Sequence, residues 1–479
     1  MLLPSCQVLS AEQVRRVHAK SVELLEEVGF SVPHDRALAI LAQKGATVDF
    51  KSQRVRFSPD LTEKTLETVP RAFTCAGRDP AFDFTVGPEA PPVCRSTGGA
   101  VNLLDFTSQA SRPLTIQDCR ELAQLIDGLE HTAIAAAQTP CDVPLPVYDI
   151  HVLKAMLESG RKHLWSLVTS SANLAYQIEM MLAVAGSAEA LQKRPVCQGI
   201  VTVLEQFRFP HDEIERLLLY GRYCIPVKVP VVPMMGTVAP ITILGTLVQA
   251  NAEAIGSAVL IELLCPGTPT WYYFFVQAMD KKSGGSIFMS PEIMLCSLGL
   301  IQMARHYRLP AAPSSFETNG SRLTDILFNN GSAVTLFALA GASEHASTGC
   351  VDMSMGISKQ GLVIGDDIWG QTKRLLAGFQ SEEAAYATEA IKRVALGSGE
   401  FLTDEHTGQF VRRESQYIPR VLSYQGHQAW AQNPKHLAEE AQERVADLLD
   451  NHEVPPLETG LQQELHRITA AAEKAAGCR

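Results

Sequence analysis

The sequence has no C-x-x-C pair, although it contains eleven cysteines in 479 residues. Their wide spacing and odd number are typical of reduced thiols in a cytosolic protein, not of a disulfide framework. A zinc site built from cysteines is therefore not expected, and we expect no tightly bound metal. These observations predict a cytoplasmic protein whose cysteines pack as small apolar side chains.

Charge is also scarce. Charged residues make up 19% of the chain and hydrophobic residues 46%. The 41 basic residues are scattered and are outnumbered by 52 acidic ones, which gives a net charge of −11. Because an acidic surface repels phosphate backbones, nucleic-acid binding is not expected. The balance of apolar and charged residues favours a large buried core.

Long apolar runs and a nucleotide motif are missing as well. The first residues, MLLPSCQVLSAEQ, lack the basic segment and apolar run of a secretory signal. The nearest approach to a membrane span, residues 252–265, is interrupted by Glu253 and Glu262, so no membrane association is expected. No G-x-G-x-x-G follows a predicted strand, which leaves a dinucleotide site without support.

The first hundred residues predict a small helical module. Ser10 and Gln13 form a capping pattern before an amphipathic helix that ends at Gly29. A second helix is expected over residues 34–45, a hairpin over 47–57 and a third helix over 58–69. The Gly- and Pro-rich stretch 74–101 is expected to wrap the main domain. We assign residues 1–100 to this N-terminal extension.

From about Thr115 onward, helices alternate with short apolar strands. Such alternation over some 250 residues predicts parallel strands joined by helices. The length favours a closed (β/α)8 TIM barrel over residues 101–432, with an open doubly wound sheet as the competitor. Residues 433–479 predict a tail of two helices. The expected helices are 116–129, 149–160, 171–186, 211–223, 242–264, 290–307, 325–341, 436–451 and 461–476; the expected strands are 133–137, 163–168, 195–203, 227–230, 270–276, 311–314 and 345–349.

One stretch points to a family. The residues P-I-T-I-L-G-T-L-V-Q-A-N-A-E, from Pro240 to Glu253, carry buried polar groups on an otherwise apolar helix. Together with P-G-T-P at 266–269, G-D-D at 365–367 and F-L-T-D-E-H-T at 401–407, they resemble the trimethylamine methyltransferase family. The resemblance implies a TIM barrel that moves a methyl group from a methylated amine to cobalamin, in one-carbon metabolism of the methanogenic or acetogenic type. The cobalamin would be carried by a partner corrinoid-binding protein.

The kind of amine follows from a residue that is absent. Trimethylamine-specific members of the family carry pyrrolysine after the segment that matches His345, whereas residues 351–363 here are standard amino acids. A quaternary ammonium already leaves as a neutral amine and needs no such help. We therefore expect the glycine-betaine-type branch and a small quaternary, betaine-like substrate. Residues 204–207, L-E-Q-F, depart from the family pattern and leave the pocket floor undetermined.

Aromatic residues supply candidates for binding a quaternary ammonium. Five follow one another from Trp271 to Phe275, and ring faces attract a cation that cannot donate a hydrogen bond. Alternate rings of such a strand are expected to fill the core. The candidate substrate-binding residues, including Glu317 as a counter-charge, are Tyr272, Phe274, Trp165, Phe316 and Glu317.

The resemblance also implies roles for His345 and for two glycines. His345 matches a recurring family histidine and is the candidate catalytic residue, placed to hold a substrate carboxylate or to face the corrinoid, with Glu344 orienting its ring. Gly98 and Gly99 are candidates for facing the corrin ring, and a plain turn is an equal alternative. Asp366 and Asp367 are expected to cap a helix, as acidic residues do at helix N-termini.

Two alternatives from other classes stay open. One is a non-catalytic barrel that binds quaternary amines. The other is a metal-dependent barrel hydrolase or lyase that uses His345 and Glu317, although no ligand cluster with metal spacing is visible. In either case we expect a homo-oligomer.

Overall fold

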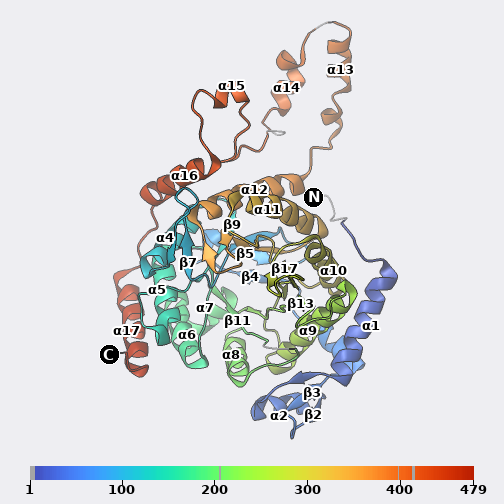
Figure 1. Cartoon of the computed structure of the whole chain (residues 1–479), viewed down its shortest axis with the longest axis vertical. Helices are drawn as coiled ribbons and strands as arrows, with labels where there is room; N and C mark the ends of the chain where they lie inside the picture. Colours follow the sequence, from blue (N-terminus) through green and yellow to red (C-terminus); the bar gives the residue numbers. More distant parts are fainter. Residues whose placement is uncertain (1–5, 204–205, 398, 413–415, 479) are drawn as a thin grey trace.

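The computed structural model describes residues 6–203, 206–397, 399–412 and 416–478 (Figure 1). Leu204 and Glu205, which belong to the segment that departs from the family pattern, lie outside the described residues. Helices surround a group of short central strands, and an elongated segment extends away from this body (Figure 1).

The helices and the hairpin predicted between residues 10 and 69 are present. Helix α1 (Ala11–Glu27) begins with a capping box, because Ser10 Oγ accepts from the Gln13 amide and the Gln13 side chain accepts from the Ser10 amide. Helices α2 (Asp35–Gln43) and α3 (Pro59–Thr68) follow. Strands β1 (Phe30–Ser31), β3 (Arg54–Arg56) and β2 (Thr47–Asp49) form an antiparallel sheet in that order. Helices α1 and α3 pack on α9 (Ile243–Leu264).

The predicted alternation of strands and helices is confirmed as a mixed α/β fold with a parallel sheet. Six strands pair in the order β12, β11, β10, β9, β6, β18. The strands are β12 (Val227–Lys228), β11 (Cys197–Ile200), β10 (His163–Trp165), β9 (Thr132–Ala136), β6 (Val93–Ser96) and β18 (Glu344–Thr348). The connecting helices are α4 (Ile116–Gly128), α5 (Tyr148–Ser159), α6 (Ser171–Ala185), α7 (Ala188–Lys193), α8 (His211–Arg222), α9, α10 (Pro291–Tyr307), α11 (Leu323–Ala340) and α12 (Lys359–Ala377).

The sheet curls strongly. Strands β12 and β18 end the six-stranded order, yet Lys228 of β12 forms an ion pair with Glu344 of β18. A parallel pair, β14 (Tyr272–Phe274) and β17 (Ala311–Pro313), continues on both sides through single bridges, Val227 to Thr270 and Ser314 to Ala346. Alternate side chains of these strands therefore point toward one another on an inner face, while the helices cover the outer face (Figure 1).

The two ends of the sheet differ. At the amino edge, where the parallel strands begin, a hairpin of β4 (Phe73–Cys75) and β5 (Phe84–Val86) packs against the strands. The ring of Phe73 meets that of Trp271 edge-on at 4.7 Å, and Phe84 meets His163 at 5.8 Å. The carboxyl edge carries two small sheets: β13 (Met234–Met235) with β15 (Gln277–Met279) and β16 (Ser286–Ile287), and β19 (Cys350–Val351) with β20 (Gly356–Ile357), β7 (Asn102–Leu104) and β8 (Ser111–Pro113).

Two helices are long and apolar enough to cross a membrane by length and composition alone. Helix α9 is a core helix, with 83% of its apolar window buried. In α11 only 39% of that window is buried. The sequence of α11 does not stand out as an apolar run, because Asp325, Asn329 and Asn330 interrupt it.

The tail helices α16 (Leu437–Asn451) and α17 (Thr459–Ala475) also match their prediction, and they pack on the helices of the body. Between α12 and α16, residues 378–432 form the segment that leaves the body in Figure 1, and we call it the arm. It contains α13 (Thr388–Ala395), α14 (Glu405–Phe410) and α15 (His427–Trp430). None of these helices was predicted from the sequence.

Asp366 and Asp367 are not helix caps, so that prediction is wrong. Both lie in the middle of α12. Asp366 accepts from the backbone amides of His131 and Thr132 at the start of β9. Asp367 accepts from three backbone amides where the arm returns to the body, those of Arg420, Val421 and Leu422. The pair ties two other segments to α12.

Candidate functional site

The inner face of the sheet carries a buried cluster of charge. Arg95 comes from β6, Lys228 from β12 and Glu344 from β18, and each is at most 1% exposed. Arg95 Nε donates to Glu344 Oε1 at 3.0 Å, and Lys228 Nζ pairs with the same oxygen. Two cations thus share one anion. This excess of one positive charge favours a ligand with an anionic group.

Aromatic rings flank both cations. The Arg95 guanidinium lies 4.2 Å from the centroid of Trp165. Lys228 Nζ lies 4.7 Å from the centroid of Trp271 and 5.2 Å from that of Tyr273. Each contact is a cation–π arrangement, which is strongest where water is excluded. The protein's own cations therefore occupy part of the ring surface on this face.

The protonation of the cluster is set by burial and mutual charge. Burial lowers the pKa of Lys228 to about 7, against the opposing effect of Glu344. Burial alone would raise the pKa of Glu344, but the charges of Lys228 and Arg95 bring it below its ordinary value. Burial also lowers the pKa of His163 to about 4, so this ring is neutral. At neutral pH Glu344 is therefore ionised and is the anion that Lys228 and Arg95 share.

Several buried polar atoms on this face lack a hydrogen-bond partner among the described residues. They include both amide atoms of Gln198, Nε1 of Trp165 and Oε2 of Glu344. Gln198 and His163 lie close to each other but not in hydrogen-bond geometry. Since buried polar groups are almost always paired, by protein, water or ligand, these atoms are available to water or to a polar ligand.

The small exposure of the inner face is at its rings. Trp165 is 6% exposed and Tyr273 7%, whereas Gln198 and Lys228 beneath them are fully buried. Phe275, two residues beyond Tyr273, is half-buried and packs edge-on against Phe288 at 5.1 Å. At the amino edge the β4–β5 hairpin covers the strands. The rings therefore line the side from which a substrate would enter.

Two of the predicted substrate-binding residues lie at this edge. Trp165 points to the inner face. Glu317 follows β17 and accepts from Ser354 Oγ at 2.6 Å and from Cys350 Sγ at 3.1 Å. Burial raises the pKa of Tyr273, and the charges of Glu317 and Glu344 add to this effect while Arg95 opposes it. Glu317 is thus within electrostatic reach of the Tyr273 ring.

The structure places the other predicted binding residues on the outer side of their strands. Tyr272 OH donates to Asn251 Oδ1 of α9 at 2.8 Å, and Phe274 belongs to the same hydrophobic core. Phe316 packs in a cluster with Trp369 of α12. Trp271 and Tyr273, not Tyr272 and Phe274, face inward, because side chains alternate along a strand. Direct substrate contact by the outer residues stays a prediction that no finding tests.

His345 follows Glu344 on β18 and so points outward. Its ring packs on Trp369 at 4.5 Å between centroids, and Nδ1 lies 3.0 Å from Ser315 Oγ. Burial lowers the pKa of His345 to about 3, so the ring is neutral at physiological pH. Glu344 points to the opposite face, toward Arg95 and Lys228. A catalytic role for His345 likewise stays a prediction.

Gly98 and Gly99 follow β6 at the carboxyl edge. A Cβ on Gly98 would lie 2.1 Å from a ring carbon of Trp165, so glycine is needed there to let the indole pack. Gly99 has a φ of +80°, and a Cβ on it would meet no atom within 4 Å. Gly98 therefore supports Trp165, while Gly99 presents bare backbone to open space, as a surface for a flat ring requires.

Among the described residues, one group has metal-binding proximity: His34, His211 and Glu215, whose ligand atoms lie within 4.8 Å of one another. This group joins α2 to α8 and does not include His345 or Glu317. His34 Nδ1 accepts from the Ala37 amide as a helix cap, which leaves Nε2 to donate to Glu215 Oε1 at 2.8 Å. A metal bound to Nε2 would place the ring proton on Nδ1, which could then no longer accept from the Ala37 amide. The side-chain cap of α2 would be lost.

Sequence reasoning did not select the charge cluster. Arg95 lies in the Gly- and Pro-rich stretch 74–101, and Lys228 and Gln198 lie in the predicted apolar strands 227–230 and 195–203, which carry no motif. One signal was available: a lysine and a glutamine inside buried strands need partners, just as the polar residues of α9 do. Which strands come face to face depends on the curl of the sheet, and the sequence alone does not give that.

Comparison with known proteins finds relatives over nearly the whole chain. The profile of the family described as trimethylamine methyltransferase (MTTB) matches residues 2–477. The trimethylamine methyltransferase MttB of Methanosarcina barkeri (strain Fusaro) is 27% identical, over 98% of this chain and 95% of that one. MttB of Desulfitobacterium hafniense (strain DSM 10664 / DCB-2) is 25% identical over 97% and 93%. The glycine betaine methyltransferase of D. hafniense (strain Y51) is 25% identical over 99% of both chains.

Solved structures share the fold at low identity. The monomethylamine methyltransferase MtmB of Methanosarcina barkeri superposes with a TM-score of 0.52 and 12% identity, over 98% of this chain and 96% of that one. A hydroxylamine complex of MtmB gives a TM-score of 0.53 and 11% identity over the same shares. These similarities concern the fold alone.

Proposed function

The chain belongs to the trimethylamine methyltransferase family, and from this premise we propose that it transfers a methyl group from a quaternary, betaine-like amine to cobalamin on a corrinoid protein. The observation that carries this proposal is the inner face: rings of Trp165 and Tyr273 at the carboxyl edge above a cluster with two cations and one anion. Such a site suits a molecule with a cationic and an anionic end.

The proposed orientation follows from charge. The carboxylate of the substrate points toward Arg95 and Lys228, whose combined charge exceeds that of Glu344. The N-methyl ammonium lies higher, between the ring surface left free at the carboxyl edge and the carboxylate of Glu317. An amine without a carboxylate, such as choline, satisfies only the second half of this site. The glycine-betaine-type branch of the family fits this arrangement.

The chain's part in the reaction is placement. A quaternary ammonium leaves as a neutral amine when one N-methyl carbon is displaced, and no proton moves in that step. Holding the carbon in line with the acceptor can lower the barrier by several kcal/mol, and rings that exclude water favour loss of charge on nitrogen. The acceptor, cob(I)alamin on a separate protein, reaches the carbon from the carboxyl edge, past Gly99.

We propose a closed (β/α)8 barrel for the whole domain. The ion pair between the end strands β12 and β18, and the two bridges that connect β14 and β17 to them, support closure. Strand β6 lies within residues 1–100 and pairs with β9 and β18. The division at residues 100 and 432, the homo-oligomer and the cytoplasmic location stay predictions.

The residues of the outer faces receive a supporting role in this proposal. They pack the strands against α9 and α12; these residues are Tyr272, Phe274, Phe316 and His345. Through Tyr272 and Phe274 this packing fixes the position of Tyr273, and through His345 it fixes that of Glu344. Trp165 and Glu317 contact the substrate directly. Among the two alternatives, the non-catalytic binder is compatible with the same pocket, while the metal-dependent hydrolase or lyase predicts stoichiometric zinc or iron in the purified protein.

The test is a panel of quaternary amines: glycine betaine, proline betaine, carnitine, butyrobetaine and choline. Each is incubated with the purified protein and free cob(I)alamin, and the cobalamin spectrum is followed. We expect methylation with at least one carboxylate-bearing amine and at least tenfold less with choline. Equal rates with choline would contradict the orientation. Binding of a betaine in calorimetry without any methylation would favour the non-catalytic binder.

A further inference from the structure

The arm exposes an unusual amount of apolar surface. Nine large apolar side chains in its described part are 50–86% exposed: Phe379, Tyr386, Ile391, Leu396, Phe401, Leu402, Val411, Ile418 and Tyr424. Aromatic side chains offer about 150–250 Å² each, and with the five smaller aliphatic ones the nine together present on the order of 1,000 Å². So many large apolar side chains in one segment are more than the singly scattered ones of an ordinary surface.

The arm does not cover this surface itself. Helix α13 has 8 residues and α14 has 6, and helices this short need tertiary packing to persist in water. Arg393 of α13 pairs with Asp404 before α14 at 2.9 Å, which holds the two limbs together. In Figure 1 both helices stand clear of the body. The apolar side chains of these helices are therefore not covered by the body of the same chain.

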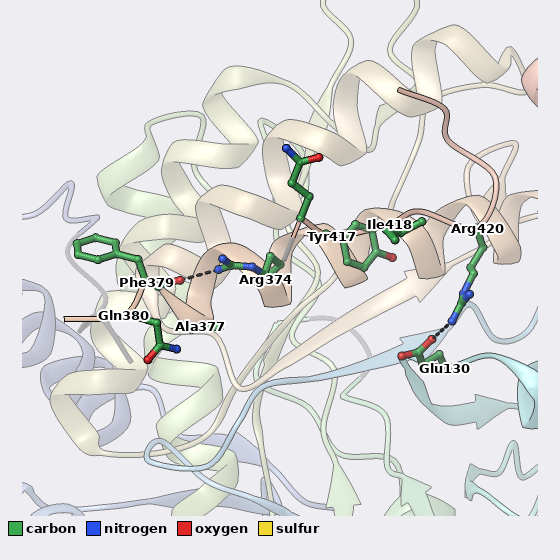
Figure 2. A pocket seen from close by; sticks show the side chains of 10 residues that line it. Glu130, Arg374, Ala377, Phe379, Gln380, Tyr417, Ile418 and Arg420 are labelled. Atoms are coloured by element: carbon green, nitrogen blue, oxygen red, sulfur yellow. Dashed lines mark hydrogen bonds and ion pairs between the residues drawn. The ribbon is translucent and has the colours of Figure 1, made fainter. Parts of the chain in front are cut away.

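The base of the arm, in contrast, is firmly held. Figure 2 shows the outgoing and returning limbs meeting at α12, around a cavity of about 580 Å³. Arg374 donates to the Gly378 carbonyl, and Arg420 pairs with Glu130 at 3.0 Å (Figure 2). Asp367 binds the returning backbone through three amides. The base of the arm is thus fixed to the body, while its outer part exposes apolar side chains. This combination allows the arm to bind another molecule.

A second uncovered apolar surface lies on α11. This helix of 18 residues contains a single charged residue, Asp325. Phe328 is 79% exposed and Leu339 38% exposed, and they lie on the solvent side together with Thr324, Gly331 and Thr335. A helix on the surface of a monomer normally shows charged residues on its solvent side. Figure 1 places α11 beside α12, from which the arm departs.

We propose that these two surfaces meet between two copies of the chain: the arm of each copy packs its apolar residues on α11 of the other, in a reciprocal dimer. One two-fold operation then covers both surfaces on both copies. The apolar area of the arm is close to the roughly 800 Å² that each partner gives to a standard interface. The inference names the surface of the expected oligomer and does not depend on the proposed chemistry.

The position of the arm favours a second copy over the corrinoid protein. The arm leaves from the C-terminal end of α12, and its base contacts Glu130, which precedes β9. This is the amino edge of the sheet. A corrinoid protein must approach the carboxyl edge, at the other end of the strands. The surface is also a poor match for a membrane, because the arm has seven acidic and five basic residues and anionic lipids select basic segments.

Sedimentation of the full chain and three variants tests the proposal. Phe328→Glu charges the α11 surface, and the double variant Leu396→Glu/Leu402→Glu charges the arm. Both sites are more than three-quarters exposed, so the monomer fold is retained and circular dichroism will check it. We expect a wild-type dimer and at least about 30-fold weaker association in each variant. Phe50→Glu, at a 57% exposed position in the N-terminal module, is the control and keeps the dimer.

Mixing the two variants distinguishes arm-on-α11 packing from other dimers. The intact arm of the Phe328→Glu chain can pack on the intact α11 of the arm variant. We therefore expect a heterodimer in the mixture, although each variant by itself stays a monomer. The proposal is overturned if the wild-type chain sediments as a monomer, if either variant still dimerises like wild type, or if mixing the two variants gives no heterodimer. Flotation of wild-type protein with anionic phosphatidylserine vesicles, lost in Phe328→Glu, would instead assign the surface to a membrane.

Discussion

At the scale of single residues, Trp165 is the side chain for which the proposed function predicts the largest effect on substrate binding. Its indole stands at the carboxyl edge with Arg95 on its face and an unpartnered Nε1. We predict that Trp165→Leu raises KM for the methyl donor about tenfold, since one desolvated cation–π contact contributes about 1–2 kcal/mol. Steady-state kinetics with cob(I)alamin in excess measures this change.

The neighbouring strand offers a matched control. Tyr272→Phe removes one hydroxyl on the outer face, which donates to Asn251. It should leave KM unchanged and cost about 1–3 kcal/mol of unfolding free energy, because the Asn251 carbonyl loses its buried donor. A tenfold rise of KM in Tyr272→Phe, with none in Trp165→Leu, would indicate that the substrate contacts the outer residues. It would refute the assignment of substrate binding to Trp165.

Glu344 holds two buried cations in place. We predict that Glu344→Gln lowers the free energy of unfolding by about 3–5 kcal/mol, because it leaves Lys228 and Arg95 without their anion in a buried site. Chemical denaturation at pH 7 measures the loss. The double variant Glu344→Gln/Lys228→Met removes one of the stranded cations and should regain part of the stability. If the double variant were less stable than Glu344→Gln, the charge account of the cluster would fail.

At the scale of elements, α9 shows how a buried carboxyl makes stability depend on pH. Burial raises the pKa of Glu253 from 4.5 to about 7, despite a hydrogen bond from Gln249. Because the folded state holds this proton more tightly, the group stabilises the fold below pH 4.5, and that contribution is lost as pH rises through 7. The difference amounts to about 3 kcal/mol.

The corresponding prediction concerns Glu253→Gln, which mimics the protonated form. The variant should unfold with nearly the wild-type free energy at pH 4.5 and should be more stable than wild type at pH 8, by up to about 3 kcal/mol. Denaturant titrations at the two pH values test it. Glu26→Gln, on the exposed side of α1, is the control and should not change the pH profile. A Glu253→Gln profile parallel to wild type would contradict the buried, protonated carboxyl.

Helix α12 is predicted to hold the arm through Asp367. Asp367→Ala leaves three backbone amides and the Tyr417 hydroxyl without their acceptor. We expect protease cleavage within residues 378–432 to become at least about tenfold faster, because opening of the arm no longer breaks these bonds. Mass spectrometry of the fragments locates the cuts. Cleavage at an unchanged rate would show that the arm is held by something else.

How far the sequence predicted these elements depends on where their signals lie. Capping residues such as Ser10 and periodic apolar positions gave α1, α9 and the tail helices nearly to the residue. The buried polar residues of α9 were expected to have partners, and Asn251 indeed contacts Ser21, Tyr272 and Tyr307. The arm helices were missed because they are short: α13 is amphipathic and Asp404 caps α14, but 8 and 6 residues give few periodic positions to recognise.

The sequence predicted the strand of β14 but not which of its rings face inward, and the reason is strand parity. A strand of aromatic residues has no apolar–polar alternation to tell its two faces apart. Tyr272 and Phe274 lie outward, Trp271 and Tyr273 inward. The ion pair of Lys228 and Glu344 joins residues 116 positions apart. A contact at this separation cannot be predicted from a local sequence pattern.

At the scale of the whole molecule, our proposals assign separate tasks to the two ends of the strands. The amino edge is covered by the β4–β5 hairpin, and the arm that leaves from this side is proposed to serve assembly. The carboxyl edge carries the rings, Glu317 and the bare backbone of Gly99, which are proposed to serve the reaction. A monomer produced by Phe328→Glu should therefore keep its methyl-transfer rate per site, while the dimer is lost.

The central claim is that one methyl carbon passes from a quaternary amine to cobalt at this edge. The most direct measurement uses a ¹³C-methyl-labelled betaine that is active in the substrate panel, and follows the label by NMR in the presence of cob(I)alamin. The account predicts one labelled methyl on cobalt for each demethylated amine formed, at a rate reduced in Trp165→Leu. Label that stays entirely on nitrogen while the betaine is bound, or that appears on cobalt equally fast without the protein, would contradict it.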